Sequence, residues 1–177
     1  PKGTASLPDG VHLCLNGKTV RGAGDSTKLS IGGEMTVTDC LTTGSFGELE
    51  QNGQGARLVL YNSRIISGTF YGEVVNYGQI SGGIFYGTVS GSGTIEDSAK
   101  VKVVFDTDGG SAVDTQKILR GQKAAAPTAP TKAGYTFDRW MDGSEAFDFA
   151  TPVIKDITLT AKWTKRGNPA GTGTGTG

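Results

Sequence analysis

The sequence predicts a mostly β protein in which a short β-solenoid, that is, a parallel β-helix, is followed by a second, smaller β domain. Three observations predict this arrangement. Glycine accounts for 29 of the 177 residues, with 19 in residues 1–98, five in residues 99–164 and five in the last 13. No proline occurs between Pro8 and Pro127, so every backbone N–H group between them can join a strand ladder. Short β-branched segments also recur in residues 1–98 about every 15 residues.

The repeated unit is clearest where residues 69–80 align with residues 84–95, at an offset of 15. A looser spacing of about 16 relates similar segments upstream, at residues 13–20 and 29–40. One such unit is too short to bury a hydrophobic face, whereas stacked units bury the inward side chains of every rung. We therefore expect rungs of about 15 residues with two interior columns of equivalent side chains. These columns are Ile65, Ile80 and Ile95, and Val59, Val74 and Val89.

An antiparallel Greek-key sandwich is the alternative fold, because it also uses many short strands. Its hairpins need tight turns, but two-residue hairpin pairs such as Asn16-Gly17 do not recur once per repeated unit in this part of the sequence. The repeat therefore favours the solenoid. Because side chains alternate along a strand, Phe70 is expected to point inward and its neighbour Tyr71 outward.

Residues 101–163 have a different pattern, with alternating strands at both ends and a cluster of aromatic residues between them. The matching segments are VVFDTDGG (103–110), a turn at Gly121, AAPTAPTKAGYTFDRW (125–140), FDFATPV (147–153) and ITLTAKW (157–163). Together they resemble one copy of the internalin B-repeat, also called the Listeria-Bacteroides repeat. The sequence departs from this family at two positions. It has Met141 where the family usually has Tyr or another polar residue, and Thr160 where the family usually has Tyr.

This resemblance implies a small β-grasp-like domain at residues 99–164, found in secreted and cell-wall proteins of bacteria and without known catalytic residues. The expected structural aromatic core is Phe105, Phe137, Trp140, Phe149 and Trp163. Each large aromatic side chain buries roughly 150 to 250 Å², so a structural role is the default for these residues. A fold resemblance alone does not give a function.

Residues 7–22 more loosely resemble the opening rungs of right-handed parallel β-helices in bacterial surface proteins. Residues 1–98 would then form the solenoid, and residues 165–177, which end in alternating Gly and Thr, a flexible linker or tail. No Gly-, Pro- or Ser-rich linker follows Ser98. We therefore expect residues 99–101 to join the domains without slack, and the second domain to cover the open end of the solenoid.

The composition also excludes several partners. Lys and Arg together number 17, as do Asp and Glu, so the net charge is zero and the charge of a nucleic-acid binder is missing. No apolar run approaches the roughly 18 residues of a membrane span, so we expect no membrane insertion in this segment. His12 is the single histidine, and Cys14 and Cys40 fit no metal or redox spacing. We expect no metal and no cofactor, no role for His12, and two buried thiols rather than a disulfide.

Catalysis is a competing hypothesis, because parallel β-helices include polysaccharide lyases and hydrolases that use paired carboxylates. The candidate pairs are Asp25 with Asp39, and Glu73 with Glu96 and Asp97. Such enzymes generally need a longer groove than these rungs supply, so we expect surface carboxylates and no enzyme activity. The DTDGG string at residues 106–110 lacks ligands of a calcium-binding EF-hand loop and is expected to be a turn.

Tyr71 and Tyr86 occupy equivalent outward positions, so we expect them to stand roughly 4.8 Å apart as an aromatic ladder, with Tyr77 at a nearby corner. Exposed aromatic rings suit sugars or a protein partner, whereas a ladder that only stabilises the stack is the structural alternative. The sequence therefore predicts a non-catalytic adhesion or display module of a secreted or cell-surface bacterial protein. Its expected ligand-binding residues are Tyr71, Tyr77 and Tyr86, and its partner a glycan or a host or bacterial surface protein. The alternatives are a mechanical spacer and a carbohydrate-active β-helix enzyme.

Overall fold

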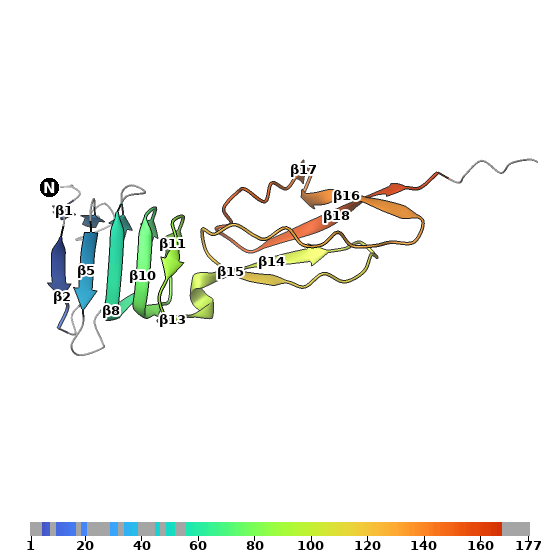
Figure 1. Ribbon diagram of the computed structural model, residues 1–177. Helices are drawn as coiled ribbons and strands as arrows, with labels where there is room; N and C mark the ends of the chain where they lie inside the picture. Colours follow the sequence, from blue (N-terminus) through green and yellow to red (C-terminus); the bar gives the residue numbers. More distant parts are fainter. Residues whose placement is uncertain are drawn as a thin grey trace, which may run out of the picture.

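The computed structural model describes residues 10–16, 34–38 and 56–167 in full, together with the backbone of short strands at residues 5–7, 19–20, 29–31, 45–46 and 49–51. These residues form three β-sheets (Figure 1). The described part of the chain contains no α-helix, only a 3-10 turn, η1 (Asp97–Ala99). The protein is therefore mostly β, as predicted.

The first sheet runs along one side of the N-terminal region, which we define as residues 5–98. Its strands lie in the order β1-β4-β7-β9-β11, and every pair of neighbours is parallel. They are β1 (Ala5–Leu7), β4 (Leu29–Ile31), β7 (Leu49–Gln51), β9 (Gly68–Phe70) and β11 (Ile84–Phe85). Because the order follows the sequence, each new strand adds to the same edge.

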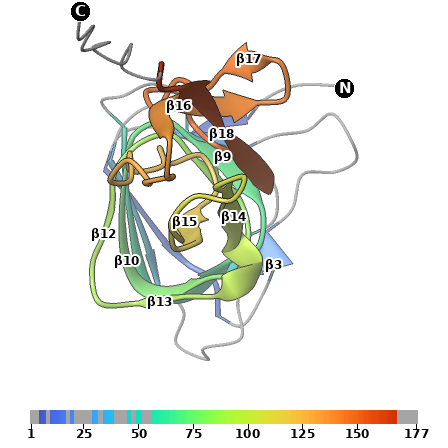
Figure 2. The same cartoon turned by 90° about the vertical axis from the view of Figure 1, so that its right-hand side faces the viewer.

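The second sheet faces the first and is also parallel. Its main strands are β2 (Val11–Cys14), β5 (Glu34–Thr38), β8 (Arg57–Ile65), β10 (Glu73–Ile80) and β12 (Val89–Ser90), joined side by side in that order. Its shorter strands are β3 (Thr19–Val20), β6 (Ser45–Phe46) and β13 (Thr94–Ile95). The chain passes from one sheet to the other and back again (Figure 2). We call one such passage a circuit, and each circuit stacks on the one before it.

The circuits differ in length. Val11 pairs with Met35, 24 positions further on, and Met35 pairs with Leu58 after 23 positions. Leu58 pairs with Val74 after 16 positions, and Val74 pairs with Val89 after 15. The predicted period of about 15 residues therefore describes only the last circuits, and the spacing of about 16 is wrong for the first ones. The strands themselves stay in register from circuit to circuit.

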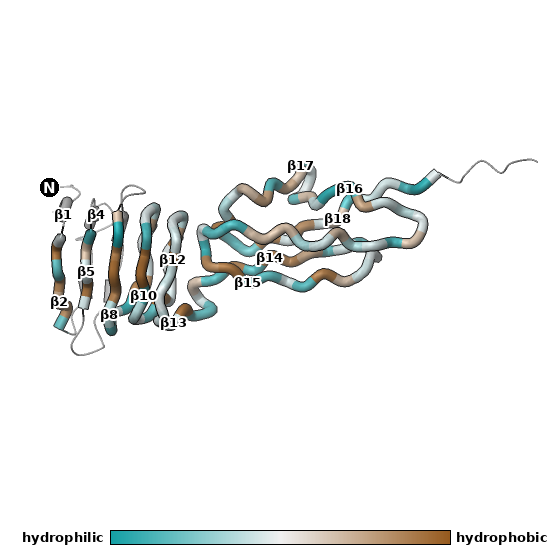
Figure 3. The backbone as a smooth tube through the Cα atoms, viewed as in Figure 1, coloured by the Kyte–Doolittle hydropathy of each residue, from teal (hydrophilic) through white to brown (hydrophobic). Residues whose placement is uncertain are grey.

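Side chains from both sheets form one hydrophobic core in the N-terminal region. Ile65, Ile80 and Ile95 lie in one column, as predicted; the first two are fully buried and Ile95 packs against the core. The rings of Phe70 and Phe85 stack in this core, with centroids 4.7 Å apart and planes 8° from parallel. The apolar stretches of β8 and β10 that contribute to it are visible in Figure 3.

Val74 pairs with Val89 as predicted, but a β-bulge in β8 displaces Val59 from the predicted valine column. Val59 pairs with Val75, one position beyond its predicted partner. Asn62, at a φ of 53°, and Ser63 together lie opposite Gly78. This extra residue changes the offset between β8 and β10 from 16 to 15 along their length. A Cβ atom at Gly78 would lie 2.1 Å from the backbone oxygen of Ser63, so only glycine fits there.

The third sheet forms the C-terminal region, residues 99–167. Its strands lie in the order β15 (Gln116–Leu119), β14 (Lys100–Asp106), β18 (Ile157–Lys165), β16 (Tyr135–Asp142) and β17 (Glu145–Ala146). The first and last strands of the region, β14 and β18, are parallel neighbours, and the other pairs are antiparallel. One face of this sheet packs against the connecting segments and encloses a second core.

Aromatic rings dominate this second core. Phe105 and Trp140 are buried, with ring centroids 4.9 Å apart in an edge-to-face arrangement. Phe137, Phe149 and Trp163 are half-buried and pack against the same cluster. All five aromatic residues expected in the core thus contact it, and two of them are buried.

The end of β18 corrects the predicted tail. The sequence predicts a flexible segment that begins at Lys165, but this residue is the last one of β18. The backbone N–H of Arg166 donates a hydrogen bond to the carbonyl oxygen of Gly134, at 2.9 Å. The strand continues because Lys165 pairs with Tyr135 across the sheet. Residues 168–177 lie outside the described residues.

The turn at Arg120–Gln122 holds the C-terminal region against β11, the last strand of the first sheet. The carbonyl oxygen of Arg120 accepts a hydrogen bond from the N–H of Phe85, at 2.8 Å. The side-chain amide Nε2 of Gln122 donates to the carbonyl oxygens of Phe85 and Gly87, at 2.6 and 2.7 Å. Backbone groups at the edge of a sheet are otherwise open to pairing with other chains. The turn therefore caps this edge, and we call it the capping turn below.

The link between the two regions is short. Lys100 begins β14 directly after η1, and Ala99 is fully buried in the N-terminal core. Leu119 of the C-terminal region also packs against that core. Asp97 pairs with Nζ of Lys117 at 2.9 Å and with Nζ of Lys100 at 3.1 Å. The two regions are thus joined by apolar contacts, backbone hydrogen bonds and ion pairs.

We expect the pKa of Asp97 to lie below its ordinary value, because hydrogen bonds from Lys117 and then from Lys100 stabilise the carboxylate. A pKa lowered by folding contributes stability that is present above the unfolded pKa, about 3.9, and lost as the pH falls through the folded pKa. An NMR titration of the Asp97 carboxyl carbon measures this shift. Lys117→Gln should bring the pKa of Asp97 closer to its ordinary value than Lys100→Gln does. An unchanged pKa in both variants would contradict the role of the two lysines.

Candidate functional site

Tyr71 and Tyr86 form an exposed, stacked pair at a corner of the N-terminal region. Tyr71 follows β9 and Tyr86 follows β11, and these strands are paired with Phe70 opposite Phe85. The two rings have centroids 5.1 Å apart and planes 16° from parallel. Their side chains are 43% and 40% exposed. The outward ladder expected from the 15-residue offset is therefore present.

Tyr77 belongs to a second ladder, not to the first. It stacks on Tyr61, with centroids 5.1 Å apart and planes 13° from parallel, and both side chains are exposed. Tyr77 lies in the middle of β10, four residues or roughly 13 Å of strand beyond Glu73. Its expected position at a corner beside Tyr71 is wrong. The 15-residue offset does not reveal Tyr61, because Tyr61 and Tyr77 are 16 residues apart, on the N-terminal side of the bulge.

A trench runs beside the Tyr71 and Tyr86 pair. It has a volume of about 360 Å³ and is lined by two equivalent segments, Tyr71-Gly72-Glu73 and Tyr86-Gly87-Thr88, and by Gln122 of the capping turn. In each segment a glycine lies between the tyrosine and the next side chain. A Cβ atom at Gly87 would lie 1.9 Å from the carbonyl oxygen of Gly72, so the close packing of the circuits requires glycine here.

Arg57 links carboxylates of successive circuits next to this trench. Its Nη1 lies 3.2 Å from Oε2 of Glu34, and its Nε lies 3.0 Å from Oε2 of Glu73. Both hydrogen bonds raise the pKa of Arg57 above its ordinary value, and the hydrogen bond with Glu34 has the larger effect. The guanidinium therefore stays charged. Exposed ion pairs add little stability. Their main effect here is to hold the Glu73 side chain in place beside the trench.

The structure does not bring the candidate acid and base carboxylates together. Glu73 begins β10, whereas Glu96 follows Ile95, which pairs with the last residue of β10. The eight residues from Glu73 to Ile80 span roughly 23 Å of strand, against the roughly 5 to 9.5 Å between glycosidase carboxylates. Glu96 instead pairs with Arg64 at 3.3 Å, and Asp97 pairs with lysines, as described above. Asp25 and Asp39 lie outside the described residues.

Strand β2 corrects the expectation for the cysteines. The expected burial of Cys14 is wrong, because its side chain is exposed, like that of His12. Val11 and Leu13 alternate with these two residues and pack against the core, so the period of the strand turns Cys14 outward. Nε2 of His12 lies 3.2 Å from Oγ1 of Thr38 on the neighbouring strand. Cys40 lies outside the described residues.

The DTDGG string forms a turn after β14. Asp108 and Gly109 both have positive φ angles, 46° and 80°, and the N–H of Asp108 donates to Oδ1 of Asp106 at 3.0 Å. The Asp108 carboxylate pairs with Lys132 at 3.3 Å. Within the described residues, no group of three or more His, Cys, Asp and Glu side chains is arranged to hold a metal ion.

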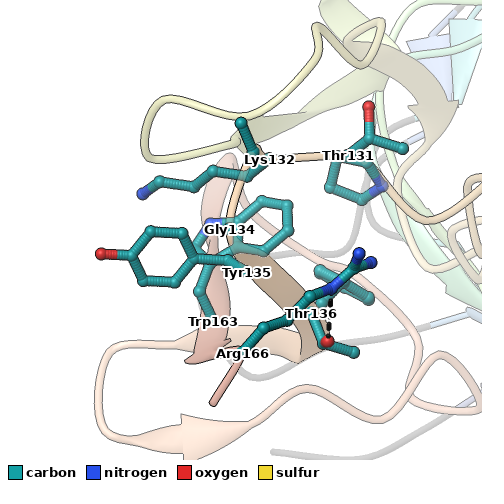
Figure 4. Close-up of a pocket in the computed structure, with 10 residues that line it drawn as sticks. Thr131, Lys132, Gly134, Tyr135, Thr136, Trp163 and Arg166 are labelled. Atoms are coloured by element: carbon teal, nitrogen blue, oxygen red, sulfur yellow. Dashed lines mark hydrogen bonds between the residues drawn. The ribbon is translucent and has the colours of Figure 1, made fainter. Parts of the chain in front are cut away.

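A second hollow, of about 400 Å³, lies in the C-terminal region between the segment 130–137, Trp163 and Arg166 (Figure 4). Nζ of Lys132 lies 5.0 Å from the ring centroid of Tyr135 and 5.5 Å from that of Trp163. Nε1 of Trp163 donates to the carbonyl oxygen of Thr107 at 3.0 Å. The aromatic rings here already hold the protein's own ammonium group, which indicates a clamp for the neighbouring turn rather than a ligand site.

Comparison with known proteins bears on the C-terminal region. Residues 102–162 match the family model of the Listeria-Bacteroides repeat domain. The C-terminal region carries this repeat. The resemblance seen in the sequence is thereby confirmed for these residues, whereas the looser likeness of residues 7–22 to bacterial β-helices stays a prediction.

Two relatives match about a third of the chain. Internalin H of Listeria monocytogenes is 44% identical over 70 residues, which are 37% of this chain and 12% of internalin H. A protein of Evansella cellulosilytica named "Putative Gly-rich membrane protein" is 37% identical over 65 residues, or 34% of this chain and 8% of that protein. The chain therefore spans a small fraction of the length of these relatives. In the part of the chain that the structure describes, no helix is long and apolar enough to cross a membrane.

Proposed function

We propose that this chain is a non-catalytic adhesion or display module of a secreted or cell-surface bacterial protein, and that its exposed tyrosines bind a glycan or a surface protein. The observation that carries the proposal is the stacking of exposed tyrosines that lie within parallel, paired strands or directly after them. A tyrosine held in or next to a rigid strand loses little conformational entropy on binding, and its ring offers apolar area next to a polar hydroxyl.

The proposal includes a finer description of the fold. Two parallel sheets with circuit stacked on circuit support a short β-solenoid in the N-terminal region. In the C-terminal region, the central position of the parallel strands β14 and β18 supports a β-grasp-like domain. A surface location is supported by the repeat and by the similarity of this chain to internalin H and to a protein named as a membrane protein.

A mechanical spacer is the second candidate function. It is favoured by the fact that each tyrosine stacks on another tyrosine, as in a ladder that serves only to stabilise the stack. The two functions differ in what the tyrosines contribute. In an adhesion module their loss weakens binding, whereas in a spacer it affects only stability.

Binding of the full chain to a glycan array and to mucin separates these functions. The tyrosine pairs are removed separately, as Tyr71→Ala/Tyr86→Ala and Tyr61→Ala/Tyr77→Ala, and all proteins are also compared by thermal melts. We expect one pair to account for binding, with an alanine substitution at a contact costing about 1 to 3 kcal/mol. A parent protein that binds nothing, or variants that bind equally well and only melt earlier, would favour the spacer.

A further inference from the structure

We propose that the trench beside Tyr71 and Tyr86 binds an uncharged, linear glycan that lies along the stack of circuits. This inference rests on the proposed function, because it requires that exposed tyrosines contact a ligand. It narrows that function to one of the two tyrosine pairs and to one class of ligand.

The shape of the trench suits a linear chain. It extends across two circuits, because equivalent segments of successive circuits line it. Its volume of about 360 Å³ lies at the lower end of the roughly 300 to 1,000 Å³ of small-ligand sites. Gly72 and Gly87 add no side chains to the lining, so a ligand can approach the backbone closely there. The Tyr61 and Tyr77 pair, in contrast, lies on a strand face.

The charge of the lining favours a neutral ligand with hydroxyl groups. Glu73 is the one charged side chain in the lining, which contains no Lys or Arg. Glu73 pairs with Arg57, which also pairs with Glu34, so the three side chains together carry one net negative charge beside the trench. This charge disfavours sulfate, phosphate and uronate groups, and a carboxylate accepts hydrogen bonds from sugar hydroxyls. Thr88, on the next circuit, both donates and accepts such bonds. Together with the tyrosine rings, these groups provide the apolar and polar contacts that a sugar ring needs.

The backbone around the trench argues against a peptide ligand. Extended peptides bind mainly by adding a strand to an open sheet edge. Here the N–H groups of Tyr86 and Gly87 both donate to the carbonyl oxygen of Phe70, and the carbonyl oxygen of Thr88 accepts from Val74. The carbonyl oxygen of Gly87 accepts from Gln122. Because these backbone groups already form hydrogen bonds within the protein, we expect side chains to make the contacts with the ligand.

The test is isothermal titration of the full chain with three uncharged hexasaccharides, namely cellohexaose, chitohexaose and mannohexaose, and with one anionic hexasaccharide of hyaluronan. We expect at least one uncharged probe to bind and hyaluronan not to bind. Tyr71→Ala/Tyr86→Ala should weaken binding about tenfold or more, and the matched control Tyr61→Ala/Tyr77→Ala should stay within about twofold of the parent. Thr88→Trp, at an exposed position, fills the trench without touching the core and should weaken binding to a similar extent.

The outcomes separate this inference from the proposed function. Any of three results overturns the proposal that the trench binds an uncharged glycan. These are binding lost only in the Tyr61→Ala/Tyr77→Ala variant, binding of hyaluronan alone, and a folded Thr88→Trp variant that binds like the parent. A parent that binds none of the hexasaccharides but binds mucin or another array component through its tyrosines also overturns it. In each of these cases the proposed function stands. A parent that binds nothing on the array, on mucin or in titration overturns both.

Discussion

We expect the Gly121→Ala protein to lose about 3 kcal/mol of stability and to release the capping turn from β11. Gly121 has a φ of 96°, which costs a residue with a Cβ atom roughly 1 to 2 kcal/mol. A Cβ atom there would also lie 2.6 Å from the backbone nitrogen of Phe85, so the turn has to move away from the strand. The hydrogen bonds of Phe85 with Arg120 and Gln122 are then weakened, at roughly 0.5 to 1.5 kcal/mol each.

Gly134→Ala is the matched control, because Gly134 has a φ of 76° but a Cβ atom there would meet nothing within 4 Å. It should show the backbone strain alone, about 1 kcal/mol. Chemical denaturation gives both free energies of unfolding, and hydrogen exchange at the Phe85 amide reports directly on the cap. Faster exchange at Phe85 is expected in Gly121→Ala only. Equal losses in the two variants, with Phe85 still protected in both, would show that the turn does not hold the regions together.

Equivalent positions in successive circuits could be predicted from the sequence. A parallel stack places residues of fixed offset side by side, so the offset of 15 was enough to find the Ile80 and Ile95 column and the Tyr71 and Tyr86 pair. The repeat in the C-terminal region was recognisable because its aromatic residues and turn glycines recur in a characteristic order. Both signals lie within short segments of the chain.

What the sequence did not reveal depends on contacts between distant residues. One extra residue at the bulge beside Asn62 changes the offset to 16 and conceals the Tyr61 and Tyr77 pair. A bulge shifts the pairing of two strands by one residue. The composition of the strands is the same with or without this shift, so composition does not reveal the bulge. The sequence predicts a turn at Gly121 but not its contacts with β11, because Gln122 bonds to backbone carbonyl groups 37 and 35 positions away.

The exposed position of Cys14 was within reach of sequence reasoning. Val11 and Leu13 are inward in β2, and strict alternation then places Cys14 on the same face as His12. The general tendency of cysteine to be buried gave the wrong expectation. Where a clear alternation and a residue-type preference disagree, the alternation is the better guide, because the pleat of a paired strand fixes the direction of every side chain.

The capping turn and the trench share one residue, so stability and binding are coupled at the junction. Gln122 hydrogen-bonds to the circuit that carries Tyr86, and it also lines the trench. Release of the turn therefore removes part of the lining. For this reason the binding test uses substitutions on the N-terminal region alone, and Gln122 is left unchanged.

We expect Phe70→Ala and Tyr71→Ala, substitutions at adjacent residues, to lower stability by very different amounts. Phe70 is fully buried and stacked on Phe85, so its truncation should lower the free energy of unfolding by about 3 to 5 kcal/mol. Tyr71 is exposed next to it, and its truncation should cost less than about 1 kcal/mol.

Chemical denaturation followed by circular dichroism measures both, because Trp140 and Trp163 lie in the C-terminal region and their fluorescence reports on that region alone. Tyr86→Ala serves as a second outward control and should resemble Tyr71→Ala. A cost for Tyr71→Ala equal to that for Phe70→Ala would make the tyrosine a core residue. The ladder would then be structural, and a loss of binding in the tyrosine variants would reflect unfolding rather than a lost contact.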